Sequence, residues 1–140
     1  MTAGYSGTQL VRKLGLKEGL SVSLVDPPDG FRELLEPADF GLIASGPVDV
    51  VIVFACWQGE LVLAFQQAMS RIPANGAIWV AWPKKASRVP TDISENDLRD
   101  LLLPTGMVDN KVAALTEVWS GLRFVVRREH RPAWTGGVAG

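Results

Sequence analysis

The sequence is poor in the side chains that most often carry out chemistry. Its 140 residues include one histidine, His130, and one cysteine, Cys56. A Ser-His-Asp triad, or a zinc site with several Cys and His ligands, would have to be assembled from these two residues. One cysteine cannot form an internal disulfide, which fits a reducing compartment. We therefore expect no metal site and no disulfide framework.

The chain also lacks a strong charge of either sign and a long apolar run. Its formal net charge is −1, and residues 84–140 carry nine Lys or Arg against seven Asp or Glu. This falls far short of the basic face of a nucleic-acid-binding protein. The longest apolar run, residues 50–57, is much shorter than the ~20 residues that span a bilayer, and the first residues resemble neither a signal peptide nor a lipidation signal. We expect a cytoplasmic protein that binds neither membranes nor nucleic acids.

What the sequence does contain is an alternation of apolar strands and amphipathic helices. Its length predicts one domain, residues 1–140, with residues 1–7 and 132–140 flexible. Alternating or continuous apolar runs predict strands, and apolar residues at helical spacing predict helices. The expected strands are 20–28, 41–45, 48–56, 77–83, 108–115 and 122–128, and the expected helices are 9–15, 31–37, 58–72 and 93–103.

This order predicts an α/β fold. Strands that alternate with helices form a mostly parallel sheet with helices on both faces. The short connection between the last two strands, near residues 116–121, allows only an antiparallel hairpin. The expected architecture is a compact three-layer Rossmann-like open sheet, and its ending resembles the C-terminal half of class I methyltransferases.

Candidate binding residues gather where the expected strands end. In open parallel sheets, ligands bind beyond the carboxyl ends of the strands. Lysine and arginine there would neutralise an anion, and tryptophan would offer a stacking surface. The candidates are Asp26, Trp82, Lys84, Lys85, Arg88, Trp119 and Ser120.

Each of these signals also has a purely structural interpretation. The lysines and Arg88 fit a solvated loop, and tryptophans commonly fill the space between a sheet and its helices. Ser94 with Asp97, or Asp92 with Glu95, has the spacing of a capping box. Cys56 has no histidine near it in sequence and fits a small buried apolar residue. His130 lies among arginines near the expected flexible tail, where we expect no chemical role.

Two charged residues interrupt the strand expected at 108–115. Asp109 and Lys111 occupy alternate positions, which predicts that both point to one face of the sheet. If a helix covers that face, they would need partners, because an unpaired buried charge is costly. They fit either a solvated sheet edge or a polar cluster beneath the ligand-binding edge.

Several short segments of the sequence, taken together, have a distinctive pattern. The most distinctive are the segments 82–85 (WPKK), 109–111 (DNK) and 119–122 (WSGL), and similar strings extend from Tyr5 to about Arg128. In these segments the chain resembles a family of short uncharacterised bacterial proteins, a domain of unknown function. The resemblance implies a compact α/β protein of the bacterial cytoplasm. It implies no activity and no catalytic residue.

Two functions from different classes remain open. The first is a non-catalytic Rossmann-like domain that binds a small anionic ligand or a partner protein at the carboxyl edge of its sheet, without a cofactor. The second is an S-adenosylmethionine-dependent methyltransferase-like enzyme. Against the enzyme stands the segment after the first expected strand, where Pro27 and Pro28 occupy a turn that usually needs glycines. A homodimer is compatible with either function, because exposed tryptophans are favoured at interfaces.

Overall fold

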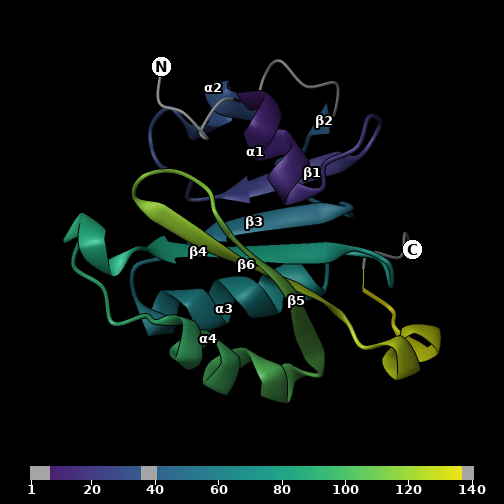
Figure 1. The fold of residues 1–140 in the computed structure, drawn as a ribbon. Coiled ribbons are helices and arrows are strands. Elements are labelled where there is room, and N and C mark those ends of the chain that lie inside the picture. Colours follow the sequence, from purple (N-terminus) through teal and green to yellow (C-terminus); the bar gives the residue numbers. More distant parts are fainter. Residues whose placement is uncertain (1–6, 36–40, 137–140) are drawn as a thin grey trace.

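The computed structural model describes residues 7–35 and 41–136, with side chains from residue 10 onward. These residues form a six-stranded sheet between two layers of helices (Figure 1). The expected flexibility of residues 1–6 and 137–140 and the expected end of the helix at 36–37 lie outside the described residues. The helices are α1 (Gly7–Leu14), α2 (Phe31–Leu35), α3 (Gln58–Met69) and α4 (Glu95–Leu102), and the strands are β1 (Ser21–Val25), β2 (Gly41–Leu42), β3 (Val50–Phe54), β4 (Ala77–Pro83), β5 (Met107–Ala114) and β6 (Trp119–Val126).

The strand order confirms a mostly parallel sheet with an antiparallel ending. The order is β2-β1-β3-β4-β6-β5. Strands β1 to β4 run parallel to one another, and β6 is antiparallel to both β4 and β5. The carboxyl ends of β1, β3, β4 and β5 therefore meet at one edge, where the hairpin between β5 and β6 also turns.

One face of the sheet packs against α3 and α4. Every residue of β3 and β4 is buried, as their continuous apolar runs predicted. On this face Phe65 of α3 meets Phe124 of β6 edge to face, with ring centroids 5.4 Å apart. Such aromatic pairs stabilise a core beyond the area that they bury.

The other face packs against α1 and α2 around Trp79, which is completely buried in β4. Its indole Nε1 donates to the carbonyl of Leu14 at 3.1 Å, so it satisfies one of the last carbonyls of α1. The amide of Gly15, with φ +69°, bonds to the carbonyl of Arg12, and the amide of Leu16 bonds to that of Val11. These bonds form a Schellman motif, which ends the helix.

The C-terminal hairpin differs from the expectation in two respects. Strand β6 begins at Trp119 rather than at 122, so the turn comprises residues 115–118. Strand β5 contains a bulge between Asp109 and Lys111, which pair with Phe124 and Arg123 respectively. Asn110 is the extra residue, and it breaks the alternation of side chains along the strand.

The segment after β6 returns to the helical layer. A 3-10 helix spans Arg128–Ala133. Trp134 follows it, packs against the core beside α3, and donates from its indole Nε1 to the carbonyl of Ile72 at 2.9 Å. None of the helices in the described part of the chain has the length and apolar character that crossing a membrane requires.

Candidate functional site

A pocket of about 560 Å³ opens at the carboxyl edge of the sheet, on the side of α3 and α4. We call it the β4–α4 pocket. It lies between the end of β4, the start of β6 and the loop that leads into α4. Its lining residues are Trp82, Pro83, Lys84, Lys85, Thr91, Asp92, Ile93, Ser94, Glu95, Asp97 and Ser120.

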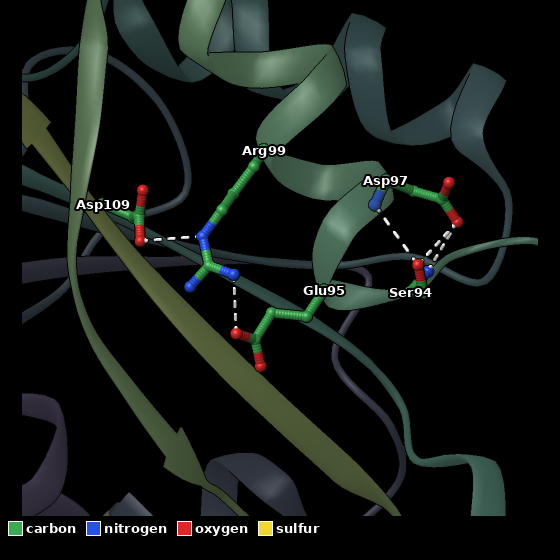
Figure 2. A network of polar contacts seen from close by, with 5 residues as sticks. All are labelled: Ser94, Glu95, Asp97, Arg99 and Asp109. Atoms are coloured by element: carbon green, nitrogen blue, oxygen red, sulfur yellow. Dashed lines mark hydrogen bonds and ion pairs between the residues drawn. The ribbon is translucent and has the colours of Figure 1, made fainter.

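The first turn of α4 forms one wall of this pocket and is held by a capping box. The hydroxyl Oγ of Ser94 accepts from the amide of Asp97 at 3.2 Å, and the Asp97 carboxylate accepts from the amide of Ser94 at 2.9 Å (Figure 2). Of the two capping boxes that the spacing allowed, the structure therefore contains the one with Ser94 and Asp97. These bonds satisfy two backbone donors and fix the pocket wall.

An ion-pair network ties the same turn to β5. The Arg99 guanidinium lies 2.7 Å from the Glu95 carboxylate and 3.2 Å from the Asp109 carboxylate, and Figure 2 shows it between the two. The hydrogen bonds to Glu95 and Asp109 raise the pKa of Arg99 above its ordinary value. Glu95, which lines the pocket, thus shares the single positive charge of Arg99 with Asp109.

The loop that precedes α4 is attached to the end of β3 and the start of α3. The hydroxyl of Thr91 donates to the carbonyl of Cys56 at 2.6 Å. The carboxylate of Asp92 accepts from the amide of Gln58, the first residue of α3, at 2.8 Å, and its carbonyl accepts from the Gln58 side chain at 2.7 Å. A carboxylate at this position stabilises a helix N-terminus. Asp92 therefore caps α3, whereas the sequence suggested that it caps α4.

Four sequence candidates lie together in this pocket: Trp82, Lys84, Lys85 and Ser120. Trp82 is 7% exposed and packs into the core on the α3–α4 face. The amide of Lys84 donates to the carbonyl of Val118 at 2.7 Å, so β4 is joined to the hairpin turn beside the pocket. Lys85 is exposed, and its side chain makes no ion pair within residues 7–35 and 41–136.

The other candidates at the edge lie outside this pocket. Trp119 points to the opposite face of the sheet, where it packs against Phe54 with ring centroids 5.3 Å apart. Asp26, directly after β1, and Arg88, after the short 3-10 helix at 85–87, are both exposed and have positive φ angles of 52° and 62°. Neither lines the β4–α4 pocket.

The prediction that Asp109 and Lys111 point to one face of the sheet is wrong, so of the two interpretations left open the polar cluster beneath the edge does not form. Asp109 points toward α4, where it meets Arg99. Lys111 lies beyond the bulge and points toward α1, where its Nζ donates to the carbonyl of Lys13 at 2.6 Å. Both residues pair with the inner part of β6 rather than with its edge. Their roles are structural: one joins α4 to the sheet and the other caps α1.

Cys56 lies at the end of β3, partly buried, with no activating group. Burial and the nearby Glu60 raise the pKa of its thiol. A thiol with a raised pKa is mostly protonated near neutral pH, where it is a weak nucleophile. Among the described residues, no three His, Cys, Asp or Glu side chains cluster as metal ligands do.

The sequence interpretation missed part of the pocket wall. It assigned Asp92, Ser94, Glu95 and Asp97 to helix capping alone, and it gave Thr91 and Ile93 no place in a site. The place of these residues in the chain could have indicated their role. The loop after β4 leaves the same sheet edge and returns at α4, so its residues face the space above the strand ends. Capping and pocket lining are therefore compatible roles for the same side chains.

The fold places the chain among the Rossmann-like α/β domains, with a sheet arranged as in class I methyltransferases. The chain is similar to an S-adenosylmethionine-dependent methyltransferase from Aquifex aeolicus, with 12% identity, a TM-score of 0.59, and 87% of this chain and 90% of that chain covered. It is also similar to the magnesium protoporphyrin IX methyltransferase of Synechocystis PCC 6803, with 13% identity, a TM-score of 0.58, and 86% and 76% covered. At this level of identity the likeness establishes the fold alone.

The chain belongs to the DUF3052 family, described as proteins of unknown function, whose model matches residues 32–128. No curated protein matches the chain.

Proposed function

We propose that this chain is a non-catalytic binding domain that takes a small anionic ligand in the β4–α4 pocket. The proposal rests on the pocket itself. Lys84, Lys85 and the first turn of α4 line it together with Trp82. Its volume of about 560 Å³ lies within the range of small-molecule sites, about 300–1,000 Å³.

Three carboxylates line the pocket beside Lys84 and Lys85, and each of the three already has a structural partner. Asp97 is used in the capping box, Glu95 is paired with Arg99, and Asp92 caps α3. Lys85 and the hydroxyl of Ser120 have no side-chain partner in the described part of the chain. The positive end of the α4 dipole is already met by the carboxylates of Glu95 and Asp97 in its first turn. An anionic group would therefore bind on the lysine side of the pocket, against Lys85 and the hydroxyl of Ser120.

The residues at the usual cofactor position do not fit S-adenosylmethionine. The turn after β1 contains Pro27 and Pro28, which have no N–H to donate and leave no room for the close backbone approach that glycines allow. The residues after β2, Ile43 to Ser45, supply no carboxylate for a ribose. The hollow beside the β1 turn measures only about 290 Å³. The methyltransferase hypothesis is therefore supported by the fold only.

The resemblance in sequence and the single cysteine support a bacterial cytoplasmic setting, which forms part of the same proposal.

Thermal-shift screening tests the proposal. The purified protein is mixed with phosphate, pyrophosphate, citrate, nucleotides or S-adenosylmethionine, and each stabilising anion is measured again with two charge-reversed variants. Lys85→Glu should weaken binding about tenfold or more, because a hydrogen bond to a charged group contributes about 1.5–3 kcal/mol. Lys17→Glu is the matched control: Lys17 is exposed beyond α1 and should leave the affinity unchanged.

Two outcomes would contradict the proposal. Equal losses of anion affinity in Lys85→Glu and Lys17→Glu would show a nonspecific charge effect. No stabilisation by any of the anions would show that the protein does not bind small anionic ligands. Strong stabilisation by S-adenosylmethionine alone would favour the enzyme instead.

A further inference from the structure

The hollow beside the β1 turn lies at the same sheet edge but on the α1–α2 face, and the proposed anion binding does not involve it. It measures about 290 Å³ and lies between the turn after β1, α2 and the β5–β6 hairpin. We call it the α2–hairpin pocket. Its lining residues are Pro28, Asp29, Gly30, Phe31, Leu34, Thr116, Val118 and Trp119.

The walls of this pocket are fixed by packing. Phe54 lies between Phe31, at a centroid distance of 4.7 Å, and Trp119, at 5.3 Å, and both pairs are edge to face. On the hairpin, the hydroxyl of Thr116 accepts from the amides of Val118 and Trp119 at 3.1 Å each. A wall held in this way is present before a ligand arrives, so binding costs little ordering entropy.

The chemistry of the lining is apolar with one negative charge. Leu34, Val118 and Trp119 provide partly exposed apolar surface, whereas Phe31 is only 1% exposed and supports the wall from the core. Asp29 is the one ionisable residue in the lining, and its carboxylate is exposed and accepts no hydrogen bond from any described residue. An aromatic wall attracts a cation through its ring faces, and a carboxylate at the rim attracts the same charge.

We propose that the α2–hairpin pocket binds a small aromatic amine, with its ring against Leu34, Val118 and Trp119 and its ammonium group against Asp29. The size agrees with this class, because a cavity of about 150 Å³ lined by apolar side chains holds a benzene ring. Twice that volume accommodates one ring with a short aminoalkyl chain. The opposite charge preference separates this pocket from the β4–α4 pocket, so the two proposals stand independently.

Three probes of similar size test the charge preference: 2-phenylethylamine, 2-phenylethanol and phenylacetate. Their affinities are measured by isothermal titration calorimetry, with saturation-transfer NMR for weak binding. The amine should bind at least about threefold more tightly than the alcohol, as expected for an exposed ion pair, and the carboxylate most weakly. Asp29→Asn should remove the preference for the amine but keep the affinity for the alcohol.

Two further variants make the test specific to this pocket. Glu117→Gln removes an exposed carboxylate from the same hairpin without touching the lining, and it should leave the preference intact. Val118→Phe should fill the pocket and abolish binding of both the amine and the alcohol. The proposal is overturned if the three probes bind equally, if Asp29→Asn and Glu117→Gln behave alike, or if none binds at millimolar concentration.

Discussion

Replacing Gly121 with alanine should destabilise the protein, because β6 passes too close to its neighbours for a side chain. A Cβ atom at this position would lie 3.0 Å from Leu115 Cγ and Cδ1 and 3.0 Å from Trp79 Cε3. Favourable carbon contacts occur at about 3.5–4.0 Å, so each neighbour would have to move by about half an ångström. Trp79 and Leu115 are both 1% exposed or less, which leaves them little freedom to move.

The expected magnitude is a balance of two effects. Overpacking a core costs typically about 1–3 kcal/mol, whereas replacing a strand glycine by alanine recovers about 0.5–1 kcal/mol of backbone entropy. We expect Gly121→Ala to lower the free energy of unfolding by about 1–2 kcal/mol. For a domain of this size, this corresponds to a melting temperature lower by roughly 3–8 °C.

Urea unfolding followed by tryptophan fluorescence measures this change. The matched control is Gly59→Ala in α3, where a Cβ meets nothing within 4 Å. Because alanine is the better helix former, this control should stabilise the protein, by up to about 1 kcal/mol. In the background of Leu115→Ala, the penalty of Gly121→Ala should shrink but not vanish, since one of the two colliding side chains is gone and Trp79 remains. If Gly121→Ala is as stable as the wild type, the close approach that we describe is wrong.

Three other predictions follow from the polar contacts. Ser94→Ala should cost about 1 kcal/mol in urea unfolding through loss of the α4 cap, whereas replacing the exposed Ser45 should cost nothing measurable. Asp109→Asn should lower the free energy of unfolding by less than about 1 kcal/mol, and this difference from wild type should shrink in high salt. A difference that does not depend on salt would contradict the ion pair. Burial and Glu60 raise the pKa of Cys56, so its alkylation rate should increase with pH at a midpoint above that of the same thiol in urea. Glu60→Gln should lower this midpoint. A midpoint below the value in urea would refute the assignment.

The sequence was most informative where one physical effect dominates. The apolar runs at 50–54 and 77–83 are buried on both sides, as expected for central strands rich in β-branched and aromatic residues. The α/β alternation followed from the apolar patterns, and the antiparallel ending followed from the short connection between the last two strands. These features predicted which strand ends meet at one edge of the sheet. Of the seven candidates expected at that edge, Trp82, Lys84, Lys85 and Ser120 line one pocket.

The predictions that were wrong concern strand positions where a single residue changes the direction in which the following side chains point. Asn110 inserts an extra residue into β5, and this bulge sends Lys111 to the face opposite Asp109. Nothing in the sequence 107–114 distinguishes a bulge from a regular strand, because the choice depends on how β6 pairs with it. The orientation of Trp119 was equally hidden, since β6 begins earlier than its apolar run indicates, and alternation then places Trp119 and Ser120 on opposite faces.

The proposed function depends most on where the anion binds. Backbone NMR spectra of the isotope-labelled protein, recorded as pyrophosphate is added, test it directly. We predict that the amides of Ser94 to Asp97, Lys84, Lys85 and Ser120 shift in a saturable manner, and that these shifts disappear in Lys85→Glu. Shifts concentrated instead on the turn after β1, at Asp26 to Gly30, or spread over exposed lysines without saturation, would contradict the proposal that the β4–α4 pocket is the anion-binding site.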